Sequence, residues 1–342
     1  MDFEIMDFLS EDDKIQILEL YQNQKLAINH HPNWEIEKKP NVLNKYALLK
    51  DNNIIVFYSR ILESHFSKLP FIKTATINFP FYQNKEVGVK GLLEISNHYK
   101  AKKYTKIDIQ LYYCNSNENY FIEQSILKKY TNYILQNNIS SLEINLHKTI
   151  DSIQFNFKNV LKKNIKSSIN KGVYAKQLFS NSEYENLERI YSKMYANKNI
   201  SINKMLNFNK LVEFIKTTNL GYIIGVFSAE NILIGGVVII THNNRAEYLV
   251  GATHPEFKKL PSSHIAILEA IKIAKNLNCS IFDMGGYVFD ISEKQEYKSI
   301  NDFKYNFTQD IIFYPKKIEI QLNRIFYCIY KTIIKITTYA RS

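Results

Sequence analysis

The sequence lacks long apolar runs and is poor in cysteine, and both absences narrow what the protein can be. No apolar run reaches the roughly 18 residues that a membrane-spanning helix needs, so we expect none. The three cysteines, Cys114, Cys279 and Cys328, lie far apart and form no CxxC pair. Their spacing argues against a disulfide framework or a zinc site and fits a reducing compartment. The acidic first residues, MDFEIMDFLSEDDK, lack the basic region of a signal peptide, so we expect a cytoplasmic protein.

Several catalytic signatures are missing as well. The sequence contains no GxSxG, HExxH, Walker or GxGxxG motif, and no Cys/His spacing indicates a metal site. We therefore expect no metal ion and no cofactor.

What the sequence does have is an excess of positive charge. Lysine and arginine number 44 against 33 aspartates and glutamates, which gives a net charge of +11. Such an excess favours an anionic partner, either nucleic acid, a phosphorylated metabolite or a membrane surface. The alternative is that it only reflects a lysine-rich composition. The length of 342 residues predicts about two domains.

The first half of the chain is predicted to mix helices and strands. Two apolar runs, 46–49 and 54–59, flank the sequence DNN and indicate a hairpin. Other segments show helical spacing of apolar residues or short β-branched runs. They predict helices at 11–24, 86–99 and 120–137 and strands at 3–6, 106–111 and 141–146.

The pattern starts again near residue 155. Three apolar runs separated by short turns predict an antiparallel meander over 222–228, 233–242 and 246–252. The other expected elements are helices at 157–171, 182–195, 208–216 and 262–278 and a strand at 280–284. Helix, helix, three antiparallel strands, helix and strand is the element order of a GNAT acyltransferase domain. The first half repeats this order less clearly.

We therefore predict an α+β protein of two tandem GNAT-like domains with mixed central sheets. The N-terminal domain is expected over 1–150 and the C-terminal catalytic domain over 151–316. Residues 317–342 are expected to form a basic amphipathic helix, because Ile318, Leu322, Ile325 and Ile329 recur at helical spacing among lysines and arginines. We expect this helix to pack back on the first domain, and the other use of such a helix is contact with an anionic membrane surface.

Four segments of the second half resemble the FemAB family, the aminoacyltransferases that build peptidoglycan interpeptide bridges, and related GNAT acyltransferases. The segments are LKKNIKSSINKGV (161–173), YLVGATHPEF (248–257), FDMGG (282–286) and DFKYNF (302–307). They follow one another in the family's order and span most of 155–315. The first half agrees with the family only in length and element order.

The segment DFKYNF carries the most specific part of the resemblance. Family members keep an F-K-x-x-F element whose lysine lies in the substrate cleft and counters negative charge, which here corresponds to Lys304. Phe303 and Phe307 would exclude water, and an ammonium in a low-dielectric cleft attracts an oxyanion more strongly than one in solvent. The alternative is a lysine that extends outward to solvent between two core aromatics.

The glycine pair Gly285–Gly286 follows an apolar strand and ends the family's DxGG turn, which the resemblance places in the cleft. Glycine permits a positive φ and the close approach of a ligand. Asp283 is expected to cap this turn, with a position facing the cleft as the alternative. Tyr287, Asp283 and His264 are candidates for a general base, and the sequence does not choose among them.

Lys162 is a further candidate for an anion contact. It lies between Lys158 and Lys166 on one helix face, and the resemblance places an arginine at its position. Lysine keeps the charge but loses the bidentate grip on phosphate, and a solvated face is the alternative. The loop HPEFKKLPSSHI (254–265) contains no glycine, whereas acetyl-CoA enzymes use a glycine-rich turn at this point to hold pyrophosphate.

The resemblance implies a transferase that moves an aminoacyl group from aminoacyl-tRNA to an amine of a peptidoglycan or other cell-envelope precursor. Catalysis would fall to Lys304, and Lys162, Gly285, Gly286, Asp283, Tyr287 and Phe303 would contact substrate. The expected partners are an aminoacyl-tRNA or acyl-thioester donor, a nucleotide- or lipid-linked precursor and, peripherally, the inner membrane surface. Two alternatives stay open. One is a thioester-dependent N-acyltransferase for an amino sugar of capsule or lipopolysaccharide, and the other is a noncatalytic basic interaction module.

Overall fold

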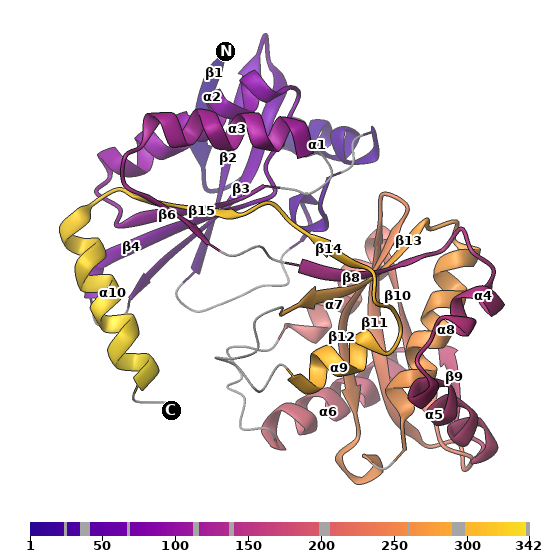
Figure 1. Cartoon of the computed structure of the whole chain (residues 1–342). Coiled ribbons are helices and arrows are strands. Elements are labelled where there is room, and N and C mark those ends of the chain that lie inside the picture. The colour runs from indigo at the N-terminus through magenta and orange to yellow at the C-terminus, as the bar shows by residue number, and fades with distance from the viewer. Residues whose placement is uncertain are drawn as a thin grey trace. The chain divides into compact units, whose positions relative to one another are not determined.

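The computed structural model contains two mixed β-sheets, each with its own helices (Figure 1). It describes residues 1–23, 26–34, 42–66, 69–111, 116–136, 140–197, 206–258, 260–288 and 298–339. Two compact units result. Unit 1 takes in Met1–Trp34, Lys39–Ile139 and Phe313–Ser342, and unit 2 takes in Ser140–Ile312. In the part of the chain that the structure describes, no helix is both long enough and apolar enough to cross a bilayer.

Unit 1 is built on the sheet β1-β2-β3-β4-β6-β15-β7, with β5 paired to β3. Its long hairpin β2–β3 turns at Asn52 and Asn53, which both have positive φ as a tight two-residue turn requires. The strands are β1 (Asp2–Met6), β2 (Val42–Asp51), β3 (Ile54–Phe66), β4 (Leu69–Asn78), β5 (Phe81–Tyr82), β6 (Lys106–Gln110), β7 (Tyr133–Gln136) and β15 (Lys317–Gln321). The helices are α1 (Glu11–Asn23), η1 (Ile28–His30), α2 (Lys85–Ala101), α3 (Ser116–Lys129) and α10 (Arg324–Tyr339).

Unit 2 is built on the sheet β14-β8-β13-β12-β11-β10-β9. The strands are β8 (Ser140–Asn145), β9 (Tyr174–Gln177), β10 (Gly221–Phe227), β11 (Leu233–His242), β12 (Arg245–Thr253), β13 (Ile281–Tyr287) and β14 (Ile311–Phe313). The helices are α4 (Ile150–Phe155), α5 (Asn159–Asn170), α6 (Asn181–Asn197), α7 (Phe208–Thr218), η3 (Pro255–Phe257), α8 (Ser262–Asn276) and α9 (Lys298–Tyr305).

Helices α6 and α8 cover opposite faces of this sheet, and the glycine pair in β11 shows how closely they approach. A Cβ on Gly235 would lie near the Ser262 hydroxyl of α8, whereas one on Gly236 would lie 2.9 Å from Leu187 of α6. Successive residues of a strand point to opposite faces, so the two helices lie on either side. Each of these Cβ atoms would also come within 2.6 Å of a backbone oxygen of a neighbouring strand, so this pair is structural.

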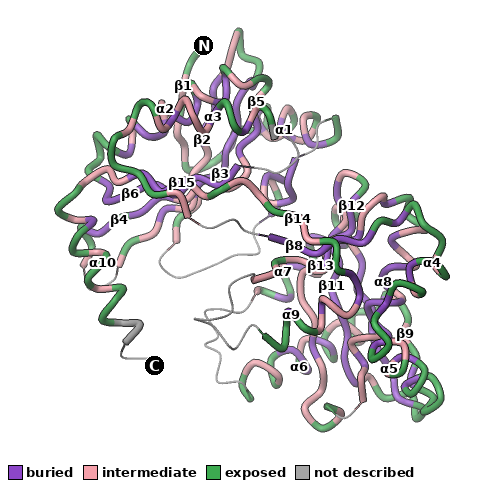
Figure 2. The backbone as a smooth tube through the Cα atoms, in the orientation of Figure 1, coloured by how far each residue is buried: buried purple, intermediate pink, exposed green. Residues whose placement is uncertain are grey.

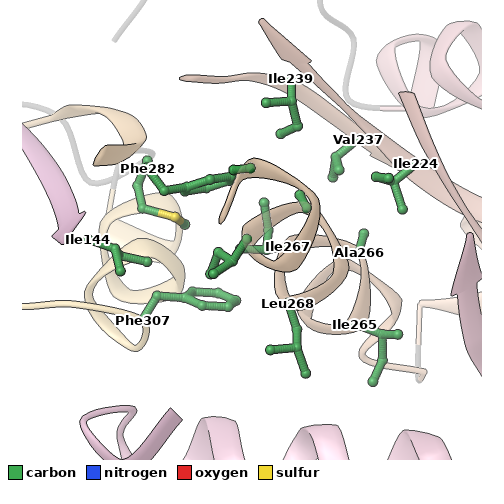
Figure 3. Packing of buried hydrophobic residues seen from close by; sticks show 14 of the residues in the cluster. Ile144, Ile224, Val237, Ile239, Ile265, Ala266, Ile267, Leu268, Phe282 and Phe307 are labelled. Atoms are coloured by element: carbon green, nitrogen blue, oxygen red, sulfur yellow. The ribbon is translucent and has the colours of Figure 1, made fainter. Parts of the chain in front are cut away.

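The core of unit 2 lies between the sheet and α8. Apolar side chains of β10, β11, β13 and α8 meet there, and Figure 3 shows Phe282 and Phe307 beside Ile267 of α8. Phe307 follows α9 directly and is buried. The buried ring of Phe307 just beyond its C-terminal end therefore fixes α9 against the core.

Each sheet contains one strand whose neighbour in the sequence belongs to the other sheet. Strand β8 follows β7 along the chain but pairs with β13, and β15 follows β14 but pairs with β6 and β7. The chain therefore enters unit 2 after residue 139 and returns to unit 1 after residue 312. The sequence pattern had predicted the first of these boundaries near residue 150.

Most predicted elements are present, including both meander hairpins and the helix that Ser10 caps by accepting from the Asp13 amide at 3.1 Å. Two predictions are wrong in part. Residues 317–321 are a strand, not the first turns of the C-terminal helix, because Ile318 and Ile320 alternate with polar residues at the strand period of two. Residues 133–136 are likewise the strand β7, whereas the sequence pattern predicted a helix that ended at residue 137.

Candidate active site

Lys304 lies in the last turn of α9, and its side chain is only 8% exposed. Its Nζ donates a hydrogen bond of 2.8 Å to the carbonyl oxygen of Gly286 in β13. Asn301, one turn earlier, holds α9 to the same strand end, because its amide both donates to Val288 O at 2.6 Å and accepts from Val288 N at 3.2 Å. Helix and strand end are thus joined at two points. Lys304 and the glycine turn at Gly285–Gly286, which were both singled out in the sequence, are therefore in direct contact.

The glycine turn lies where two central strands part. The parallel ladder between β12 and β13 ends at the pair Glu247–Asp283. Gly285 beyond it has φ +74, and a Cβ there would lie 3.2 Å from Tyr248 O and 3.5 Å from Lys304 Nζ. Gly286 is exposed and has open space around its Cα. Gly285 is therefore required by the backbone, whereas Gly286 lies at an open surface where a Cβ would have no atom within 4 Å, Lys304 Nζ included.

Asp283 caps this turn, as the sequence predicted. Its Oδ1 accepts from the Gly285 amide at 2.8 Å and from the Ser141 hydroxyl, and its Oδ2 accepts from Arg245 Nη2 at 2.9 Å. The same Arg245 nitrogen lies 2.6 Å from Glu143 Oε1. These contacts engage both oxygens of the Asp283 carboxylate within the sheet. Asp283 supports the turn and does not face outward.

The pKa values of the two ionisable groups follow from burial among these charges. Burial lowers the pKa of Lys304 to about 8, and the carboxylates of Asp283 and Glu247 offset part of that effect. Burial also raises the pKa of Asp283, with Glu247 adding to the rise and the Arg245 guanidinium opposing it. Lys304 is thus a cation held at some cost in a site with little water.

The aromatic residues of DFKYNF form a wall with His264 of α8. The His264 ring stacks on Phe303 with centroids 5.3 Å apart, and Phe303 meets Phe307 edge-on at 5.4 Å. Burial lowers the pKa of His264 to about 4. A group of that pKa is a poor proton acceptor at neutral pH. His264 therefore acts as packing for Phe303 and α9, and is a weak candidate for the general base.

Tyr287 follows the glycine turn and Lys162 lies on α5, and the contacts of both are with other residues. Tyr287 stacks with Tyr305 at 6.2 Å, and burial raises the pKa of its phenol, which disfavours the phenolate that a base would need. Lys158 Nζ lies 4.1 Å from the centroid of the Tyr305 ring. Lys162 Nζ donates to Phe155 O and lies over that residue's ring. The binding roles predicted for Tyr287 and Lys162 stay predictions.

The hollows of unit 2 lie beside this site. One of about 170 Å³ is lined by Lys148, Asn156, Phe307 and Thr308, and a second borders it along β8 and β14. Neither is lined by Lys304 or by the glycine turn. Among the described residues no cluster of three or more His, Cys, Asp or Glu side chains could hold a metal ion.

Sequence reasoning missed the residues that hold Asp283 and the α9 contact. Arg245, Glu143, Ser141 and Asn301 are all buried. A usable signal was present, because Glu143 in SSLEIN and Asp283 in IFDMGG are charged residues in the middle of otherwise apolar strands. Buried charges are normally paired, so each of them implied a cationic partner.

Comparisons with known proteins agree with this geometry. Residues 216–335 match the model of the FemAB family. The fold is similar to the crystal structure of FemX, with a TM-score of 0.70, 13% identity and coverage of 95% of this chain and 99% of that one. It is also similar to the C-terminal domain of a designated lysylphosphatidylglycerol synthetase from Agrobacterium fabrum, with a TM-score of 0.62, 7% identity and coverage of 94% and 95%.

A tandem GNAT protein from the clavulanic acid biosynthesis pathway is similar as well, with a TM-score of 0.52, 10% identity and coverage of 94% and 99%. No curated protein sequence matches. The predicted α+β architecture of tandem GNAT-like domains is therefore confirmed, and the findings support an acyltransferase. The match to the FemAB family model is limited to residues 216–335, and this segment includes β12, β13 and the Lys304 helix.

Proposed function

We propose that the protein transfers an aminoacyl group from an aminoacyl-tRNA to an amine of a peptidoglycan or other cell-envelope precursor. The observation that carries the proposal is the buried ammonium of Lys304. It lies 2.8 Å from the carbonyl oxygen of the exposed Gly286, just beyond the end of the β12–β13 ladder. The FemAB match over 216–335 contains all of these residues.

For this reaction the protein needs mainly to position the two substrates and to stabilise the negative charge that develops. The acceptor amine attacks the ester carbonyl, a C–N bond forms, and the C–O bond to the terminal ribose of the tRNA breaks. The amine loses a proton, and the leaving ribose oxygen gains one. Negative charge develops on the carbonyl oxygen during the attack, and a donor in a site with little water stabilises it more than one in bulk solvent.

Lys304 is suited to that role. The hydrogen bond to Gly286 uses one of its three N–H groups and fixes where Nζ lies. The Phe303–His264 stack covers the same helix from the side of α8. Gly286 is exposed and adds no side chain at the strand end that Lys304 contacts, which leaves that surface open to the ester. Asp283 and Arg245 hold the turn without entering the reaction.

The first test is donor consumption. Purified protein is incubated with radiolabelled aminoacyl-tRNAs, with acetyl-CoA and with an extract of envelope precursors. We expect label from one aminoacyl-tRNA to move to a precursor. Consumption of the thioester without tRNA would instead favour the thioester-dependent N-acyltransferase.

The second test removes the ammonium. Lys304→Met should lower the rate of transfer at least about tenfold, since a single oxyanion donor is worth that much or more. The control is Lys163→Met, which removes an exposed lysine from α5. An unchanged rate in folded Lys304→Met protein would contradict the role assigned to Lys304.

A further inference from the structure

The C-terminal helix α10 is attached to unit 1 by one face. The Phe326 ring lies 5.3 Å from Phe71, and the Tyr330 ring lies 5.8 Å from Phe66. The Tyr327 hydroxyl donates to the buried carboxylate of Glu319. Aromatic residues of α10 therefore fix its orientation on the sheet, and its other side points away from unit 1.

The outer side carries a row of isoleucines. Ile325 is 73% exposed, Ile329 37% and Ile336 63%. The spacing i, i+4, i+11 places the three side chains within about 40° of one another around the helix axis. Figure 2 shows exposed positions along the length of α10. A surface helix normally turns such a row toward a core, and this one turns it outward.

Positive charge flanks the row. Arg324, Lys331 and Lys335 are exposed and lie roughly a third of a turn from the isoleucines, on the side between them and the buried tyrosines. Lys331 lies 3.9 Å from Glu319 and is still half exposed. The sequence of α10, RIFYCIYKTIIKITTY, contains no acidic residue. An apolar row beside a basic flank is the pattern of a helix that lies in the plane of a membrane interface.

We propose that the outer face of α10 binds the surface of a membrane that contains anionic lipid. Isoleucines at this face would enter the boundary between head groups and acyl chains, and the three cations would meet lipid phosphates. A second copy of the chain fits less well, because a symmetric α10–α10 contact would oppose three positive charges to three with no acid on either helix. RNA also fits less well, since isoleucine offers bases no stacking surface.

The inference does not depend on aminoacyl transfer, because binding is measured without a reaction. It gives the proposed transfer a location, since a lipid-linked acceptor would be met at the same surface. Failure of one proposal leaves the other standing.

The test uses the full-length protein and vesicle flotation. Vesicles of phosphatidylcholine alone are compared with vesicles of equal parts phosphatidylcholine and phosphatidylglycerol, at low and high salt. We expect binding to the anionic vesicles, with weaker binding to the neutral ones and at high salt. Replacing Ile325, Ile329 and Ile336 by Gln should weaken it at least about tenfold. Arg324→Gln with Lys335→Gln should weaken it by about fivefold per cation on anionic vesicles only.

Phe8→Gln is the matched control, because it removes an exposed apolar side chain of unit 1 that lies outside α10. It should bind as the unmodified protein does. A second readout is an environment-sensitive dye on the exposed Cys328, in a Cys114→Ser background, whose emission should shift to the blue with anionic vesicles. No binding to either vesicle, or unchanged binding by the isoleucine variant, would overturn the proposal. The proposal would also be overturned if the isoleucine variant lost a dimeric state instead of losing membrane binding.

Discussion

The buried ammonium of Lys304 lowers the stability of the folded protein, and its proposed role is to meet negative charge on a substrate. An ammonium that is 8% exposed has lost most of its water, and the carboxylates of Asp283 and Glu247 compensate it only in part, as the lowered pKa shows. A lysine placed only for packing could be replaced by an apolar residue at no cost. Such a charge is retained most readily where it meets negative charge from a substrate.

This reasoning predicts that Lys304→Met is at least as stable as the unmodified protein at pH 7. The folded-state pKa is about 8 against an ordinary value of 10.5. Between these values the unfolded chain binds more protons, so the stability of the lysine protein rises with pH relative to the variant. The variant should therefore be up to about 3 kcal/mol more stable at pH 7 and lose that advantage as the pH approaches 10.5.

Urea unfolding at pH 7, 8, 9 and 10 measures this difference. Lys163→Met is again the control, and its stability relative to the unmodified protein should not change with pH over this range. A Lys304→Met protein that is less stable at pH 7 would show that the lysine has a structural role.

The two glycines of the turn make a matched pair for a second prediction. Gly285→Ala should destabilise the protein by about 1–2 kcal/mol, because alanine is strained at φ +74 and its Cβ would lie 3.2 Å from Tyr248 O. Gly286→Ala should stay within about 0.5 kcal/mol, since its Cβ meets nothing within 4 Å. Denaturant unfolding of both variants measures the difference. Equal losses would show that Gly285 is not under backbone constraint.

Gly286→Ala also tests the assigned place of the substrate. A methyl group there would add bulk to the exposed residue whose carbonyl oxygen binds Lys304, so the transfer rate should fall although stability does not. This combination would separate a substrate-binding surface from a merely exposed turn.

The same residues show how much of the candidate site could be predicted from the sequence. Lys304, Gly285, Gly286 and Asp283 could be singled out because a glycine pair after a strand and a lysine between phenylalanines are unusual. The bond between Lys304 and Gly286 could not, because 18 residues separate them and no periodicity fixes that distance. Arg245 was missed because its two partners, Glu143 and Asp283, come from different parts of the chain.

At the scale of elements, a buried ion cluster joins β8, β12 and β13. Arg245 of β12 bonds to Glu143 of β8 and to Asp283 of β13, at 2.6 and 2.9 Å. It therefore connects three adjacent strands directly beneath the glycine turn. Removing one partner of such a cluster leaves buried charge uncompensated.

We expect Arg245→Met to destabilise unit 2 by about 3–5 kcal/mol. The loss should shrink as the pH falls, because without the guanidinium the pKa of Asp283 rises further and protonation then removes the unpaired charge. The control is Lys272→Met, which breaks a half-exposed pair with Glu269 at 3.1 Å and should cost less than about 1 kcal/mol. Thermal unfolding at pH 5 and pH 7.5 provides the comparison. A deficit that is the same at both pH values would argue against buried charge as its cause.

The elements themselves show which patterns were decisive. Hairpins at Asn52–Asn53 and Asn243–Asn244 were predictable, since asparagine tolerates the positive φ that these turns have. Residues 317–321 were mistaken for helix because Ile318, Leu322 and Ile325 also fit helical spacing. The strand β8 was recognised as a strand and assigned to the wrong half, because its own sequence does not say that it pairs with β13.

At the scale of the whole molecule, the chain crosses between the two sheets twice. Unit 1 receives β15 from the C-terminal end of the chain, and that strand lies between β6 and β7. Its Glu319 forms a 2.5 Å ion pair with Lys106 of β6, which also bonds to Asp108 at 2.9 Å. All three side chains are buried. Residues 1–139 therefore do not contain all the strands of the sheet they begin.

We predict that residues 1–139 fold only together with the C-terminal part of the chain. A fragment of residues 1–139 lacks β15, so β6 and β7 have no strand between them and Lys106 loses one of its two buried carboxylate partners, Glu319. A fragment of residues 140–342 keeps unit 2 but presents β15 and α10 without their sheet. Expressed alone, the first fragment should be insoluble or lack cooperative unfolding, because open strand edges favour aggregation.

Co-expression should restore a stable complex, since β15 of the second fragment can then complete the sheet of the first. The measurement is copurification through a tag on the 1–139 fragment, followed by thermal unfolding of the complex. The control replaces the second fragment by residues 140–312, which retain unit 2 but lack β15 and α10, and it should not copurify. If the 140–312 fragment is retained as well as the longer one, surfaces other than β15 hold the halves together and the prediction fails. If the 1–139 fragment unfolds cooperatively by itself, the inserted strand is dispensable for unit 1.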